Sequence, residues 1–286
     1  MDLDGVGIWS LSLRFGDPGE AAEAATELDE LGYRALWVPD VGGPVFETLE
    51  NLLGATRRAV IATGILNLWM HEPAEVAAAR ASLVEKFGER LLLGIGVSHA
   101  PVIDRQEAGR YRRPLRAMAD FLDALDAASP PVPVDGRVLA ALGPKMLELA
   151  RTRARGAHPY LVTPEHTATT RAALGAGPLV APEQAAVLTA DRAAGLEIAR
   201  AFVAPYLQLP NYANSLRRLG FTEEDVTGVS DRMVEATVVI GDEAAIAGRV
   251  AEHRAAGADH VCLQVLTAGN GFAREEWRRL APALLA

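Results

Sequence analysis

Two histidines stand just after apolar runs, where the chain turns, and imidazole is the side chain that gives or takes a proton near neutral pH. His99 follows the run 91–98, and His166 follows a Thr-Pro-Glu turn. His99 is therefore a candidate catalytic residue that contacts substrate or cofactor; the alternative is a water-exposed histidine. His166 is a candidate contact to a cofactor tail or substrate; the alternative is an ordinary residue near a helix N-terminus.

Hydrolytic and metal chemistry find less support in the sequence. Ser98 and His99 are adjacent, so their side chains would point apart, and no Gly-x-Ser-x-Gly motif is present. The six histidines contain no His-x-x-x-His pair, and the single cysteine, Cys262, excludes a cysteine-based zinc site and an intrachain disulfide. We therefore expect no metal centre and keep a hydrolase only as a minor alternative.

The composition fits an enzyme of the cytoplasm. Half of the 286 residues are hydrophobic, which is enough for a large core. No apolar run reaches the about 18 residues of a membrane span, and the N-terminus lacks the basic and apolar regions of a signal peptide. The formal net charge is −9 and the basic residues are scattered, which argues against a nucleic-acid partner. We expect a cytoplasmic protein that acts on a small molecule.

The elements that must position these residues alternate between short apolar runs and amphipathic helices. Strands are predicted at 6–13, 35–39, 59–66, 91–95, 138–141, 157–162, 184–188 and 260–266. Helices are predicted at 18–31, 73–87, 110–128, 144–153, 164–174, 191–204, 242–256 and 275–285, with an irregular helical insertion at 210–228. Eight strand–helix units predict an α/β fold, a (β/α)₈ TIM barrel forming one domain over residues 1–286. An open doubly wound sheet is the alternative, which is weakened because no Gly-x-Gly-x-x-Gly follows the first strand.

In such a barrel, functional groups gather at the carboxyl ends of the strands. Trp9 and Trp69 lie near strand ends and could wall a substrate pocket with His99, although plain packing is the alternative for each tryptophan. The turn 142–144 (Leu-Gly-Pro) opens a helix, and proline fits the first helical position because its missing N–H costs nothing there. Free amides and the helix dipole make this turn a candidate anion site, with a tight turn without ligand as the alternative.

Five segments of the chain resemble, in order, the luciferase-like monooxygenase superfamily, and within it the coenzyme F420-dependent oxidoreductases of the actinobacterial type. The segments are LGYRALWVPD, ATGILNLW, FGERLLLGIGVSH, LAALGPKMLELA and VVIGDEAAIAGRVAEHRAAGADHVCLQV. Each motif alone is weak, but the ordered set spans nearly the whole chain. The resemblance implies a TIM barrel that binds the deazaflavin F420, with FMN as the alternative cofactor, and a homodimer.

The resemblance also implies how one end of the site meets the cofactor ring. Asp40, at the end of the second strand, would approach the deazaflavin as a candidate catalytic and cofactor-binding residue; a helix cap or turn aspartate is the alternative. The bond Gly64–Ile65 would be a non-proline cis peptide that bulges against the back face of the ring, with an ordinary strand end as the alternative. Asn67 would be a polar neighbour of the ring.

Main-chain groups carry the rest of the implied cofactor site. The family binds the cofactor phosphate at the positions of Ala141, Leu142 and Gly143, and it places main-chain contacts at Val97 and Ser98. The chain departs from the sugar-phosphate dehydrogenases of the family, which have a glutamate in place of His99 and a histidine in place of Val41. A sugar phosphate is therefore not the expected substrate.

Taken together, these features predict an oxidoreductase that transfers a hydride between F420 and a small organic molecule. An FMN-dependent monooxygenase or reductase on the same barrel is the first alternative. A cofactorless barrel that only binds a ligand is the second, since a fold alone does not determine function.

Overall fold

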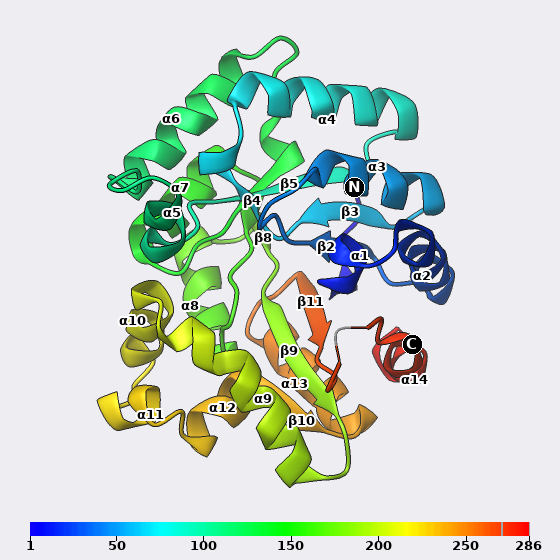
Figure 1. Ribbon diagram of the computed structural model, residues 1–286, viewed down its shortest axis with the longest axis vertical. Coiled ribbons are helices and arrows are strands. Elements are labelled where there is room, and N and C mark those ends of the chain that lie inside the picture. The colour runs from blue at the N-terminus through cyan, green and yellow to red at the C-terminus, as the bar shows by residue number, and fades with distance from the viewer. Residues whose placement is uncertain (270, 286) are drawn as a thin grey trace.

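A single curled sheet of parallel strands forms the centre of the computed structural model, which describes residues 1–269 and 271–285 (Figure 1). Its strands are β1 (Gly5–Trp9), β2 (Ala35–Val38), β3 (Val60–Thr63), β4 (Leu66–Asn67), β5 (Leu91–Gly96), β6 (Arg137–Leu139), β7 (Gly156–Ala157), β8 (Leu179–Val180), β9 (Glu183–Leu188), β10 (Val238–Gly241) and β11 (His260–Val265). Their order is β10-β9-β11-β1-β2-β3-β5-β6-β7-β8, and β4 pairs with β5.

The sheet closes on itself because β8 and β9 are two parts of one bent stretch of chain. Only Ala181 and Pro182 separate them. The amide of Ala181 donates to Ala157 on one side (3.0 Å), and the carbonyl of Pro182 accepts from Cys262 on the other side (2.8 Å). The ring of strands is thus complete, with β10 attached outside it to β9. The predicted TIM-barrel fold is confirmed.

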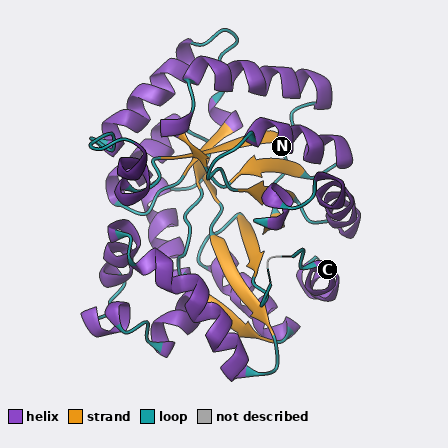
Figure 2. Ribbon diagram, in the orientation of Figure 1, coloured by secondary structure: helices purple, strands orange, loops and turns teal. Residues whose placement is uncertain are grey.

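Helices surround this barrel, as expected when parallel strands are buried on both faces (Figure 2). They are α1 (Ser12–Phe15), α2 (Pro18–Leu31), α3 (Val45–Ala55), α4 (Pro73–Phe87), α5 (Ala100–Gln106), α6 (Pro114–Ala127), α7 (Pro144–Arg153), α8 (Pro164–Leu174), α9 (Arg192–Leu207), α10 (Pro210–Arg218), α11 (Glu223–Thr227), α12 (Asp231–Thr237), α13 (Glu243–Ala255) and α14 (Arg274–Leu284). Short 3₁₀ turns lie at Leu68–Met70 and Val134–Gly136. No helix in the described ranges is long and apolar enough to cross a membrane.

Local signals set the ends of several helices. The side chain of Asp17 accepts hydrogen bonds from the amides of Gly19 and Glu20, which caps α2, and Gly32 ends it with a φ of 102°. α2 begins at Pro18, and α4, α7 and α8 also begin at a proline. These four helices have the bounds that the sequence predicts.

The structure differs from the prediction where tertiary contacts redirect the chain. The first strand ends at Trp9 rather than at residue 13, because Ser10 Oγ accepts from the amide of Leu13 and α1 begins. The predicted strand 157–162 is reduced to β7, and Leu161 leaves the extended conformation with a φ of 54°. The helices α3, α5 and α12 and the strands β8 and β10 were not predicted from the sequence.

The barrel interior is filled by aromatic and polar side chains that contact each other directly. Trp37 is fully buried, stacks on His158 with ring centroids 4.4 Å apart, and donates through Nε1 to His260 Nε2 (3.1 Å). His260 Nδ1 in turn donates to the carbonyl of Leu3 (2.8 Å). Trp37 is thus a core residue that lies inside the barrel.

Candidate functional site

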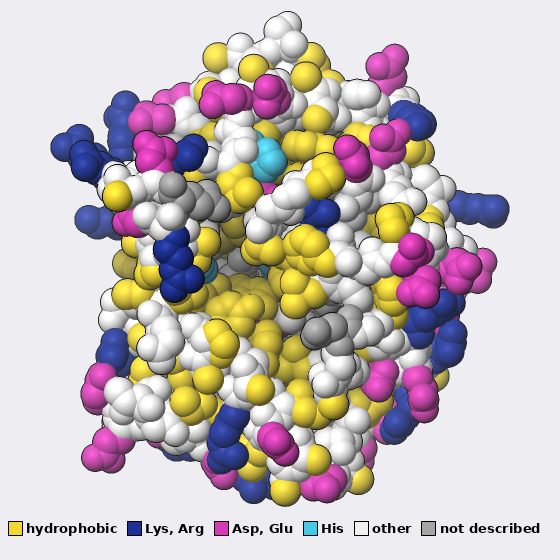
Figure 3. Space-filling model, in the orientation of Figure 1, with side chains coloured by type: hydrophobic (Ala, Val, Ile, Leu, Met, Phe, Trp, Pro, Cys, Tyr) yellow, Lys and Arg dark blue, Asp and Glu magenta, His cyan; other side chains and the backbone are white. Residues whose placement is uncertain are grey.

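The predicted site residues come together at the carboxyl ends of the strands, which face the viewer in Figure 1. Parallel strands place these ends on one face of the barrel. A hollow with largely hydrophobic walls lies in this face (Figure 3). The strand ends on this face carry the predicted residues: Trp9 at the end of β1, Asp40 after β2, Gly64 and Ile65 after β3, Asn67 at the end of β4, Val97, Ser98 and His99 after β5, and Ala141, Leu142 and Gly143 after β6.

Asp40 forms a buried polar pair with His71, a residue that the sequence did not single out. The Asp40 side chain has no exposed surface, and its Oδ2 accepts from His71 Nε2 (2.7 Å) and from the amide of Asn67 (3.0 Å). Its Oδ1 has no partner among the described residues, and its amide donates to the carbonyl of Ile65 (3.3 Å). Asp40 therefore ties the loops after β2 and β3 together. The sequence signal for His71 is its place between β4 and α4.

The peptide bond Gly64–Ile65 is cis, which confirms the prediction for this position. Trp9 supports this bond, because its indole Nε1 donates to the carbonyl of Gly64 (3.1 Å). A Cβ at position 64 would lie 2.4 Å from Trp9 Nε1, so only glycine fits. The side chain of Ile65 packs against Gly96 at the end of β5. The bulge is thus held from β1 and β5.

The turn before α7 presents a set of unpaired amides. Within the described residues, no hydrogen bond is donated by the amides of Ala141, Leu142, Gly143 or Lys145. A Cβ at Gly143 would meet nothing within 4 Å, so the space in front of it is open. Backbone N–H groups at the start of a helix are the donor set that a phosphate takes.

His166 lies behind this turn, and internal hydrogen bonds engage both of its ring nitrogens. Nε2 donates to the carbonyl of Leu142 (3.2 Å), and Nδ1 accepts from Thr170 Oγ1 (3.2 Å). Burial lowers its pKa, which keeps the ring neutral. His166 therefore contacts the turn before α7 through the main chain of Leu142.

The loop after β5 rests on Trp69 and Tyr111. The indole Nε1 of Trp69 donates to the carbonyl of Val97 (2.8 Å), and its ring lies 5.7 Å from that of Tyr111. Tyr111 Oη donates to the carbonyl of Ser98 at 3.5 Å, and Ser98 has a φ of 52°. Trp69 thus supports the main chain at Val97 and Ser98.

His99 joins the β5 loop to α10. Its Nδ1 donates to Asn211 Oδ1 (3.0 Å), and its ring lies 5.2 Å from that of Tyr212. Burial lowers the pKa of His99, and the hydrogen bond to Asn211 partly opposes this shift. The ring is therefore neutral near pH 7, with the lone pair of Nε2 available as a proton acceptor.

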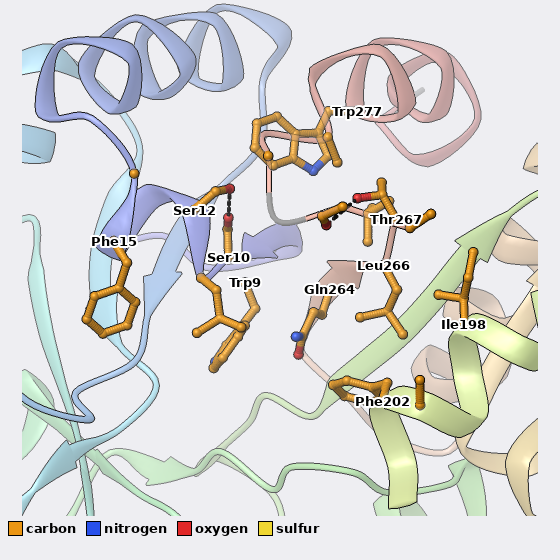
Figure 4. Close-up of a pocket in the computed structure, with 18 of the residues that line it drawn as sticks. Trp9, Ser10, Ser12, Phe15, Ile198, Phe202, Gln264, Leu266, Thr267 and Trp277 are labelled. Atoms are coloured by element: carbon orange, nitrogen blue, oxygen red, sulfur yellow. Dashed lines mark hydrogen bonds between the residues drawn. The ribbon is translucent and has the colours of Figure 1, made fainter. Parts of the chain in front are cut away.

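A cavity of about 830 Å³ opens between the ends of β1 and β11, α1 and α9 (Figure 4). Its walls include Trp9, Leu11, Phe15, Ile198, Phe202, Gln264, Leu266 and Trp277. Of the three predicted substrate-pocket residues, Trp9 lines this cavity, whereas Trp69 and His99 do not. The volume is in the range of small-molecule binding sites.

A hydrogen-bonded chain that the sequence did not predict lies against this cavity. Tyr160 Oη donates to Gln264 Oε1 (2.7 Å) and lies 3.0 Å from Tyr206 Oη. Because Tyr160 has one proton to donate, Tyr206 must donate to Tyr160. Burial raises the pKa of Tyr206 to about 12 and raises that of Tyr160 well above its usual value, so both phenols are neutral. These residues come from three distant parts of the chain, so no local motif marks them.

A second group of buried polar residues lies deeper in the barrel. Burial raises the pKa of Glu183 to about 8, and its Oε2 accepts from the amide of Leu161 (3.0 Å). Burial lowers the pKa of His158 to about 4, and its Nδ1 donates to the carbonyl of Ala181 (2.7 Å). Both side chains are therefore uncharged near pH 7. In the described part of the chain, no cluster of His, Cys, Asp or Glu could hold a metal ion.

A closed parallel barrel with a ligand-sized cavity and a turn of free amides on its carboxyl face is the architecture of TIM-barrel enzymes. The sequence pattern of the luciferase-like monooxygenase family matches residues 6–260. The chain belongs to this family.

Known proteins with similar sequence or structure extend over nearly the whole chain. A protein of Mycobacterium tuberculosis that is assigned as a coenzyme F420-dependent oxidoreductase is 24% identical, with 92% of this chain and 94% of that protein aligned. An F420-dependent secondary alcohol dehydrogenase, solved with an F420–acetone adduct, shares the fold with a TM-score of 0.76, 15% identity and 99% of each chain covered. The oxygenating component of a diketocamphane monooxygenase from Pseudomonas putida, solved with FMN, gives a TM-score of 0.68, 11% identity and 98% coverage of each chain.

Proposed function

We propose that this protein is an oxidoreductase that transfers a hydride between coenzyme F420 and a small organic substrate. The observation that carries the proposal is the set of free amides at residues 141–143 and 145, on the same barrel face as the Ile65 bulge. The M. tuberculosis relative and the F420-dependent alcohol dehydrogenase support F420 as the cofactor. The residues present fit a flat ring that carries a phosphate.

In this proposal the main chain binds the cofactor. Ala141, Leu142 and Gly143 hold its phosphate through their amides, and His166 supports this turn through the carbonyl of Leu142. The main chain at Val97 and Ser98 contacts the cofactor between phosphate and ring. When bound, the deazaflavin ring supplies or accepts the hydride.

Side chains around the bulge orient the ring. Ile65 packs below it, and Asn67 is its polar neighbour. Asp40 is proposed as a positioning residue, because its buried carboxylate holds the amide of Asn67 and the ring of His71. His99 is proposed as the catalytic residue on the cofactor side of the site, where its Nε2 takes or gives a proton, since Asn211 engages only its Nδ1.

FMN is the second candidate cofactor, because its phosphate would find the same amides and the P. putida enzyme of this fold was solved with FMN. The test is a fluorescence titration of the purified protein with F420 and with FMN. Tight binding of F420 without binding of FMN is expected. Binding of FMN alone would replace the cofactor in the proposal, and binding of neither would overturn it in favour of a cofactorless barrel.

The phosphate site has a matched pair of variants. Gly143→Glu places a carboxylate in the open space in front of the amides and should weaken F420 binding at least tenfold by repulsion. Gly248→Glu makes the same change at an exposed position of α13 where a Cβ also meets nothing, and should leave binding unchanged. Equal affinities for both variants would exclude the turn at Gly143 as the phosphate site.

We further propose that residues 1–286 act as one domain, as a homodimer, and in the cytoplasm. Support for the dimer comes from the family resemblance. Sedimentation analysis of the purified protein tests it, and a monomer at micromolar concentration would contradict it.

A further inference from the structure

We infer that the cavity between β1, α1, α9 and β11 is the substrate site, and that it takes a neutral, largely apolar molecule whose carbonyl oxygen accepts a hydrogen bond from Gln264 Nε2. This inference rests on the proposed function, which requires an organic substrate beside the cofactor. It adds the location of the substrate and its chemical class.

The direction of the hydrogen bonds assigns the free group of Gln264. Its Oε1 is already an acceptor, because Tyr160 donates to it at 2.7 Å and Tyr206 stands behind Tyr160. Its Nε2 donates to no described residue, and Gln264, which is 4% exposed, lies on the cavity wall. In Figure 4 the amide of Gln264 points into the space between Trp9 and Leu266. Because this donor faces the cavity without a described partner, a ligand in the cavity can supply its acceptor.

The walls of the cavity determine which acceptor fits. Ile198, Phe202 and Leu266 form an apolar wall opposite Trp9. Glu197, which is exposed at the rim, is the one charged side chain among the described lining residues. With no Lys or Arg among those residues, a carboxylate or phosphate would lose its hydration without a compensating charge. A ketone or aldehyde oxygen satisfies Gln264 without this cost.

The cavity also lies next to the proposed position of the cofactor ring. Trp9 lines the cavity and at the same time donates to the carbonyl of Gly64 at the bulge. A carbonyl compound held by Gln264 would therefore lie beside the bulge at Gly64–Ile65. Trp69 and His99 do not line the cavity. The apolar part of the substrate would instead contact the wall formed by Ile198, Phe202 and Leu266.

The inference is tested by titrating the intact protein with acetophenone, ethylbenzene and benzoate and measuring the affinity for each probe by saturation-transfer NMR. These three probes share a ring and differ in the oxygen group. Gln264→Leu should weaken acetophenone binding by about three- to tenfold, the usual contribution of one neutral hydrogen bond, and should not weaken ethylbenzene binding. Gln208→Leu, the same change at an exposed position just after α9, should alter neither. Benzoate should bind at least tenfold more weakly than acetophenone.

Tyr160→Phe provides a second variant if Gln264→Leu does not fold. It removes the hydroxyl that orients Gln264, so acetophenone should again lose affinity relative to ethylbenzene. Equal effects on acetophenone and ethylbenzene in both variants, or benzoate binding as tightly as acetophenone, would overturn the inference. Titration of the same samples with F420 separates the two proposals, because F420 binding without carbonyl selectivity refutes only this inference. Carbonyl selectivity without F420 binding refutes only the proposed cofactor.

Discussion

The carboxylate of Asp40 lies 2.7 Å from His71 Nε2 and has no exposed surface, so a buried acid is balanced by one imidazole and one backbone amide. This pair joins the loop after β2 to the segment that follows β4. It therefore stabilises the part of the barrel face where the ring of the cofactor is proposed to lie.

His71→Ala should lower the free energy of unfolding by about 2 kcal/mol, because the buried Asp40 carboxylate loses a hydrogen bond of the strength typical for charged groups. Its Oδ1 already lacks a partner among the described residues. Urea unfolding at pH 7 measures this change. His71→Gln, which can restore an N–H donor, should recover part of the loss. A loss below 0.5 kcal/mol (well under the about 1.5–3 kcal/mol of such a bond) would show that water replaces His71.

Glu183 should make the protein less stable as the pH rises. Burial raises its pKa from 4.5 to about 8 in the folded state, so the carboxyl stays protonated there while the unfolded chain releases the proton. Its contribution is fully present below pH 4.5 and is lost progressively up to about pH 8, at a slope of up to about 1.4 kcal/mol per pH unit.

Glu183→Gln removes this titration, so the stability difference between variant and parent should shift in favour of the variant from pH 5 to 8 and then level off. Urea unfolding at one-unit steps from pH 5 to 9 provides the measurement. Parallel stability curves for the two proteins would mean that Glu183 is ionised in the folded state.

The buried histidines should dominate the loss of stability on the acid side. Burial lowers the pKa of His158 and of His260 from 6.5 to about 4, so the unfolded chain binds these protons first. Their stabilising contribution is present above pH 6.5 and is lost as the pH falls towards 4, at up to about 1.4 kcal/mol per pH unit for each histidine. NMR of the histidine Cε1–H signals tests the cause: neither signal should move between pH 7.5 and 5.5. A midpoint near 6.5 for either one would contradict the prediction.

His99 should titrate at a still lower pH when its partner on α10 is removed. Burial lowers the pKa of His99 and the hydrogen bond from Nδ1 to Asn211 raises it, so Asn211→Ala leaves only the lowering effect. The Cε1–H titration midpoint of His99 should fall in this variant. Asn214→Ala, also on α10 and bonded to Arg217 instead, is the control and should leave the midpoint unchanged. A midpoint that rises in Asn211→Ala would show that solvent entry outweighs the lost hydrogen bond.

The sequence by itself determined the elements whose signals are local. Proline at the first helical position and glycine after the last one placed α2 and α4, and alternation of apolar runs with helices predicted the TIM barrel. The strand ends then predicted which residues share one face, because parallel strands all end on the same side. These signals act within a few residues, so they can be read along the chain.

Contacts between distant segments were decided only by the tertiary structure. Asp40 meets His71 across 31 residues, and Tyr160 meets Gln264 across 104 residues. The bend between β8 and β9 closes the barrel through partners on β7 and β11. Such pairs depend on how the sheet curls, and neither partner carries a local mark of the other. The local pattern therefore predicted the turn before α7, and the family resemblance predicted the cis Gly64–Ile65 bond, whereas the cavity beside Gln264 emerged only from the folded chain.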